Sequence, residues 1–155
     1  MISTVTEYVQ KDPQLALYAE HMNMLMIEND STLAEFKLSI SQKYKRHRPR
    51  LLILLGNPAL LMRDEYRELW GDIPIVLCSE ENYLGPQETY TKKQAIATAD
   101  RTPLTQLADP YNMVLLYSNL YLDENIQLIC HIVPEIKKFI FIGDARQINQ
   151  TNNLD

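Results

Sequence analysis

Two short apolar runs, Leu51–Leu55 and Ile73–Cys78, constrain the fold of this chain more than any other feature of its sequence. Each run has the length of a strand, and neither alternates between apolar and polar residues. Continuous apolarity of this kind is typical of strands in a parallel sheet that is covered on both faces. Because helical patterns flank both runs, we expect an α/β fold with three layers, α-β-α, around a parallel sheet.

Helical and strand patterns alternate along the rest of the chain. The clearest helix start is a capping box at Thr32-Leu33-Ala34-Glu35, with one of residues 30–32 as the N-cap. A second start lies at Asn57-Pro58, with the amide as the cap and the proline in the first turn, and Gly71 suits the left-handed residue that closes this helix. In chain order the patterns predict helix 2–11, strand 15–21, helix 30–46, strand 51–55, helix 57–70, strand 73–78, strand 112–117, helix 120–133 and strand 138–144.

Two segments have special features. Residues 79–110 are polar and contain several prolines, so we expect an irregular stretch, with a short helix over residues 92–99 at most. The predicted helix 120–133 carries apolar residues at helical spacing, which indicates one face turned toward the core. That face is made of Leu122, Ile126, Ile129 and Val133.

The composition restricts the classes of function. The chain carries 20 acidic against 15 basic residues, whereas proteins that bind nucleic acid normally have a basic excess. The one basic run, Lys43–Arg50, suits the end of a helix better than a phosphate-binding patch. No stretch reaches the roughly 18 apolar residues of a membrane span. Residues 1–7 lack the features of a secretion signal, which says little about compartment if the chain is cut from a longer protein.

No motif supports catalysis, a cofactor or a metal. The sequence has no phosphate-binding glycine loop, no dinucleotide fingerprint and no nucleophile elbow. Its three histidines lie in unrelated predicted elements, whereas a metal site needs several convergent ligands. Cys78 and Cys130 are expected to be buried structural thiols. We therefore expect no catalytic residue, no cofactor and no metal.

Polar residues follow the predicted strands at their carboxyl ends, where open parallel sheets bind ligands. Together with the free N–H groups of the helix behind Asn57, they would form a rim for a small polar or anionic solute. The candidate ligand-binding residues are Glu20, His21, Gly56, Asn57, Ser79, Glu80, Asn82 and Asp144.

The order of several motifs resembles a known family. Arg48–Gly56 followed by Asn57-Pro58-Ala59 resembles the strand–turn–helix of periplasmic-binding-protein-like lobes, and Ile73–Leu77 resembles a later strand of those lobes. Asp123–Ile129 and Val133–Asp144 are similar to their helix and following strand. The chain looks most like the periplasmic sensor region of bacterial hybrid two-component histidine kinases, which is related to ABC-type solute-binding proteins.

The resemblance implies one flavodoxin-like lobe, residues 1–145, whose first strand lies upstream of Met1. Residues 146–155 would be a linker or a severed crossover to a missing second lobe. A solute bound between the two lobes would close them, and closure would drive signalling or transport. The implied partners are that solute, the second lobe of the same parent chain and possibly a second copy of the chain. The implied location is periplasmic, with a membrane contacted only through the parent protein.

Three hypotheses remain open. The first is an extracytoplasmic sensor lobe of a histidine kinase, which binds a solute and performs no reaction on it. The second is the solute-binding component of an ABC-type transporter, for which the expected fold is the same. The third is a small α/β enzyme that uses Cys78 or Glu80, although Cys78 has no histidine close to it in the sequence.

Overall fold

The computed structural model describes residues 2–117, 122–136 and 138. The predicted strand 138–144, including the candidate residue Asp144, lies outside the described residues apart from Lys138. The elements are α1 (Ile2–Val9), α2 (Asp30–Tyr44), β1 (Leu52–Leu55), the 3-10 helix η1 (Asn57–Met62), α3 (Arg63–Trp70), β2 (Ile75–Ser79), β3 (Tyr83–Leu84), α4 (Gln87–Thr91), η2 (Thr98–Asp100), β4 (Thr102–Pro103), α5 (Leu104–Ala108), η3 (Asp109–Tyr111), β5 (Met113–Tyr117) and α6 (Leu122–Ile132).

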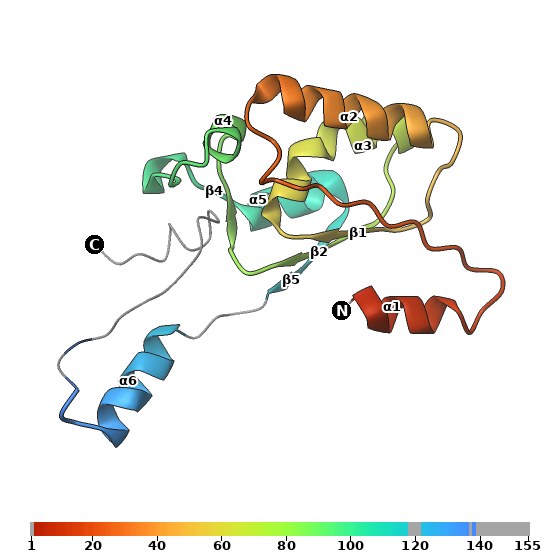
Figure 1. The fold of residues 1–155 in the computed structure, drawn as a ribbon. Helices are drawn as coiled ribbons and strands as arrows, with labels where there is room; N and C mark the ends of the chain where they lie inside the picture. Colours follow the sequence, from red (N-terminus) through yellow and green to blue (C-terminus); the bar gives the residue numbers. More distant parts are fainter. Residues whose placement is uncertain (1, 118–121, 137, 139–155) are drawn as a thin grey trace.

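The centre of the fold is a three-stranded parallel sheet in the order β1-β2-β5 (Figure 1). The two apolar runs that dominate the sequence are β1 and β2, and they pair in parallel, with Leu54 beside Leu77 and Leu77 beside Leu115. The predicted α/β class with a parallel sheet is therefore confirmed. A small antiparallel pair, β3 and β4, stands apart from this sheet.

One face of the sheet packs against α2, α3 and η1, which lie on the same side of it (Figure 1). Leu54 and Leu77 point into this core, where Leu77 has no exposed surface. Leu33 and Ile40 in α2, and Tyr66 and Trp70 in α3, recur in the sequence at the spacing of one helix face, and all four are buried here. The helical spacing of the sequence thus identified the covered face correctly.

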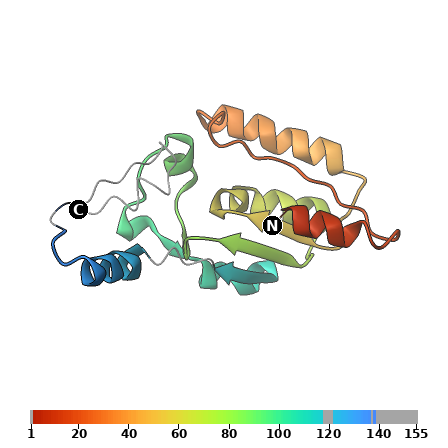
Figure 2. The same cartoon turned by 60° about the horizontal axis from the view of Figure 1, so that its bottom comes forward.

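The opposite face of the sheet is uncovered among the described residues, so the second helix layer of the predicted α-β-α fold is not seen among them. Alternate residues of each strand point to it: Ile53, Leu55, Val76, Cys78, Val114 and Leu116. Ile53 is 38% exposed and Val114 is 59% exposed. Helix α6 lies beyond the end of β5 rather than on this face (Figures 1 and 2). We call these six residues the open face.

The predicted inward face of α6 is not buried. Ile129 and Val133 are 43% and 45% exposed, and Ile126 is half-buried. The side chain of Leu122 lies outside the described residues. The helix itself forms where the periodicity predicts it, so the local pattern was right and the packing expected of it was wrong.

The N-cap of α2 lies one residue before the predicted range of residues 30–32. Asn29 is the N-cap: its Oδ1 accepts from the Thr32 N–H at 3.0 Å, while Thr32 Oγ1 accepts from the Asn29 N–H at 3.3 Å. Thr32 is therefore the third helical residue of the capping box and not its first member. The helix ends at Tyr44, two residues before the predicted end at Arg46.

Residues 15–21 do not form the predicted strand. Their backbone runs as an irregular segment along the molecule, and Leu15, Leu17 and Tyr18 are exposed. Side-chain contacts hold the segment in place instead of a strand ladder, since the Tyr18 ring meets the Tyr44 ring edge to face at 6.0 Å. The apolar residues at positions 15–19 were thus a poor guide to strand pairing here.

The long stretch 79–110 is more regular than expected. It contains β3, α4, η2, β4 and α5, so the prediction of an irregular stretch was wrong. The short helix lies at Gln87–Thr91 and not within residues 92–99. Gly71 does have the left-handed backbone predicted for it, with φ of 71° at the end of α3.

Candidate functional site

A hollow lies between the start of α3 and the segment that follows β3. Its volume is about 300 Å³, at the lower end of the range for small-molecule sites. Apart from Lys37 of α2, its lining comes from segments that follow the carboxyl ends of β1 and β2, which is where open parallel sheets bind ligands. The lining residues are Lys37, Leu61, Arg63, Asp64, Leu84, Gly85, Pro86, Gln87, Asp100, Thr102 and Leu107. We call it the polar hollow.

Lys37 brings a cation to the polar hollow from helix α2. Its Nζ lies 2.8 Å from Glu65 Oε1 and 3.4 Å from Gln87 Oε1, and its side chain is only 19% exposed. The second carboxylate oxygen of Glu65 is buried and has no partner among the described residues. The Lys37 ammonium is therefore held between Glu65 of α3 and Gln87 of α4.

Arg63 brings a second cation at the first residue of α3. Its Nη1 donates to the Leu60 carbonyl oxygen at 3.2 Å, and its Nη2 lies 3.9 Å from Asp64 Oδ2. Its Nε is buried and has no acceptor among the described residues. A guanidinium has five N–H donors, so the contacts that Arg63 makes within the fold leave much of its hydrogen-bonding capacity for an acceptor from outside.

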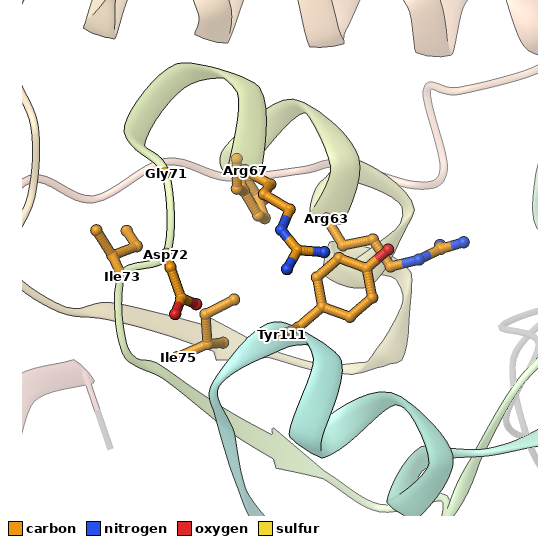
Figure 3. A pocket seen from close by; sticks show the side chains of 8 residues that line it. Arg63, Arg67, Gly71, Asp72, Ile73, Ile75 and Tyr111 are labelled. Atoms are coloured by element: carbon orange, nitrogen blue, oxygen red, sulfur yellow. The ribbon is translucent and has the colours of Figure 1, made fainter.

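Tyr111, just before β5, contacts the Arg63 end of the hollow. Its hydroxyl donates to Asp64 Oδ1 at 2.7 Å, and this bond, followed by partial burial, raises the pKa of Tyr111. Figure 3 shows the Arg67 side chain beside the Tyr111 ring, with the guanidinium carbon 5.3 Å from the ring centre. A pocket of about 10 Å³ lies here, with room for a single water.

Asn57 and Ser79, two of the predicted rim residues, are brought together but are used by the fold. Ser79 Oγ donates to Asn57 Oδ1, and Asn57 Nδ2 donates to the Tyr83 carbonyl oxygen. Ser79 Oγ also accepts from the Glu81 N–H at 3.0 Å. Asn57 and Ser79 are only 4% and 5% exposed, so they connect η1, β2 and β3 and present little surface to a solute.

Asn57 also differs from its predicted role as a helix cap. The N-cap of η1 is Gly56, and no side chain caps this helix. Pro58 does lie in the first turn, as predicted. Gly56 has φ of 86°, a left-handed backbone that turns the chain from β1 into η1, so its role is conformational.

Glu20 and His21 lie far from the carboxyl ends of the strands. Glu20 accepts from Lys43 Nζ and from the Tyr44 hydroxyl at the C-terminal end of α2, the end that packs on Trp70 just before Gly71 and β2. The hydrogen bonds from Lys43 and then from Tyr44 lower the pKa of Glu20. Because residues 15–21 form no strand, its expected carboxyl end does not exist, and the prediction of these two residues at the rim was wrong.

The remaining predicted residues are Glu80 and Asn82, which are exposed in the turn between β2 and β3. Neither lines the polar hollow, and none of the described candidates does. The residues that do line it were missed because most of them come from the stretch 79–110 and one comes from α2. These two segments are distant from each other in the sequence. The signal available in the sequence was the unusually long polar stretch itself.

The prediction that both cysteines are buried was wrong. Both are free; Cys78 is half-buried on the open face, and Cys130 is exposed on α6. Within the described ranges no three His, Cys, Asp or Glu side chains are grouped so as to hold a metal ion. No helix in the same part of the chain has the length and apolarity needed to cross a membrane.

The described residues form an α/β fold with the polar hollow as its candidate site. No family model, no curated protein and no solved structure matches this chain.

Proposed function

We propose that this chain is a binding lobe that takes a small polar solute into the polar hollow and performs no reaction on it. The observation that carries the proposal is the hollow itself. It has about 300 Å³ of space, lies beyond the carboxyl ends of β1 and β2, and is lined by two cations, two carboxylates and an amide. Lobes of this kind bind ligands at that end of the sheet.

The charges around the hollow favour a solute that carries a carboxylate and a second polar group. Arg63 presents a planar guanidinium that matches a carboxylate in geometry, and Lys37 adds positive charge on another wall. Asp64 and Asp100 supply acceptors for an ammonium or hydroxyl group on the same solute. Free amino acids and short hydroxy acids have this combination of groups.

The wider identity of the protein rests on the resemblance of its motifs to periplasmic-binding-protein-like lobes. In this proposal the chain is the first, flavodoxin-like lobe of a three-layer fold, in the extracytoplasmic sensor of a two-component histidine kinase. A second lobe of the parent chain would cover the hollow, and the solute would draw the two lobes together. The alternative within the same proposal is the solute-binding component of an ABC-type transporter. The sequence that follows Asp155 in the parent gene separates the two, because a membrane helix and a kinase belong only to the sensor.

Ligand-observed NMR with a panel of L-amino acids and short hydroxy acids tests the solute site. One lobe supplies only part of a cleft, so we expect binding at roughly millimolar Kd for at least one member of the panel. Arg63→Met should abolish the signal. Arg50→Met is the matched control, because Arg50 is an exposed arginine before β1, at the opposite end of the sheet.

Asp100→Asn provides a second variant, since Asp100 is exposed and its change leaves the core intact. It should weaken the binding of amino acids more than that of hydroxy acids, because it removes the negative charge that an ammonium group would contact. Equal signals from wild-type protein and from Arg63→Met, or no signal from any member of the panel, would contradict the proposal.

A further inference from the structure

The open face of the sheet is the largest uncovered apolar surface on the strands. Parallel sheets almost always have both faces covered, because strands buried on both sides are what makes their residues continuously apolar. Here Leu55 and Leu116, which flank Cys78 in the sheet register, are 45% and 52% exposed. The sequence therefore predicts a third layer on this face, and the described residues do not form one there.

Helix α6 has the complementary feature, an apolar stripe that no described segment covers. Ile129, Ile132 and Val133 are 43%, 67% and 45% exposed. At 3.6 residues per turn Ile129 and Val133 share one side of the helix with Ile126, while Leu128 lies away from that side, next to Ile132. Both views show α6 beyond the end of β5, clear of the sheet (Figures 1 and 2).

We propose that α6 docks on the open face and forms the third layer of the fold. The dimensions match: a helix of 11 residues is about 16 Å long, and strands of five residues have about the same length. Three strands about 4.8 Å apart make a surface roughly 14 Å wide, which one helix of 10–12 Å diameter covers. Docking would place the stripe of Ile129 and Val133 against the row formed by Leu55, Cys78 and Leu116.

The connection and its handedness support the same occupant. Four residues, 118–121, separate β5 from α6, within the usual length of a strand–helix loop. The crossover from β1 to β2, through η1 and α3, passes over the face that packs against α2. Crossovers between parallel strands are right-handed, so a chain that leaves β5 and returns toward β1 passes over the opposite face. The open face is the one that α6 would cross.

The area of the open face argues against a second copy of the chain as its cover. A surface of roughly 16 by 14 Å is far smaller than the ~800 Å² per partner that a stable interface buries. A helix tethered to the adjacent strand needs no such area, because its attachment already keeps it close to the face. A second copy therefore remains an outcome that the experiment distinguishes.

The two native cysteines report on this docking, because Cys78 lies on the open face and Cys130 lies on α6. We expect a short bis-maleimide to link Cys78 to Cys130 within one chain, with a yield that does not change on tenfold dilution. Peptide mapping identifies the link. Links found only between two chains, falling with dilution, would show that a second copy covers the face and would overturn the proposal.

Alkylation of Cys78 in Cys130→Ser protein gives an independent test. Ile129→Asp should raise the alkylation rate at least about fivefold, the change expected when a contact of modest energy is lost. Leu128→Asp is the matched control, since Leu128 is an exposed apolar residue on the other side of the same helix. Equal rates for the two variants would refute docking through this stripe, and an increase only on Val5→Asp would assign the cover to α1 instead.

Discussion

Replacement of Asn57 by alanine removes the side chain that connects η1 to β2 and β3. Asn57 Oδ1 accepts from Ser79 Oγ, and its Nδ2 donates to the Tyr83 carbonyl oxygen, at a position that is 4% exposed. Each buried hydrogen bond contributes about 1 kcal/mol net, and a group left with fewer partners in a buried place adds a further penalty. We expect Asn57→Ala to lower the free energy of unfolding by about 2–3 kcal/mol.

Urea unfolding followed by tryptophan fluorescence measures this loss. The chain has one tryptophan, Trp70, which is buried and stacked on Tyr66 with ring centres 5.7 Å apart, so its emission reports on the core. The slope of free energy against urea should stay unchanged, since the substitution alters stability and not the surface exposed on unfolding. Asn82→Ala is the control, because an exposed asparagine should change stability by no more than about 0.5 kcal/mol.

The result separates two roles for Asn57. If its side chain serves the fold, as the structure shows, stability falls and solute binding by the folded variant is unchanged. If Asn57→Ala lost less than about 0.5 kcal/mol and also lost solute binding, the reasoning would be refuted, and Asn57 would belong to the binding rim as the sequence predicted.

Three further predictions concern the core and its titration. Leu77→Ala should cost about 2–5 kcal/mol in urea unfolding, because Leu77 is fully buried in the centre of the sheet; a loss under 1 kcal/mol would contradict its place there. Gly85→Ala should cost about 1–3 kcal/mol, because a Cβ would lie 2.6 Å from a side-chain atom of buried Ile96. Ile96→Ala in the same chain should recover part of that loss, because it removes the side-chain atoms that the Cβ would meet, and strict additivity in the double-mutant cycle would rule out the clash. Burial raises the pKa of Tyr90 to about 12, so the neutral phenol is favoured in the folded state; stability from this group is complete below the ordinary pKa of about 10 and is lost as the pH rises from there toward 12. Ultraviolet titration of wild-type protein against Tyr90→Phe checks it, and a Tyr90 that ionises near pH 10 in the folded protein would contradict it.

The local signals in the sequence predicted the sheet well. Leu51–Leu55 and Ile73–Cys78 became neighbouring parallel strands, and Leu33, Ile40, Tyr66 and Trp70 packed where helical spacing put them. These features depend on residue periodicity over one element, which a single sequence contains. Gly71 was predictable for the same reason, because one residue type suits a left-handed helix end.

The candidate site was not predictable, because it depends on contacts between distant segments. Lys37 comes from α2, Arg63 from α3 and Gln87 from α4, and no motif spacing connects them. The rim residues were inferred from strand ends, and the inference fails where a strand is absent, as for Glu20. It also fails where the fold uses the polar side chain itself, as for Asn57 and Ser79. A local sequence pattern can predict where a strand ends. It does not show which polar side chains form hydrogen bonds within the fold and so are not available to a ligand.

The most direct test of the solute site is chemical-shift mapping of the isotope-labelled protein during titration with the best-binding member of the amino-acid and hydroxy-acid panel. The account predicts that the largest saturable shifts fall on residues around the polar hollow, with Arg63, Gln87 and Asp100 among them. Saturable shifts confined to Glu80 and Asn82, or an absence of saturable shifts anywhere, would contradict it.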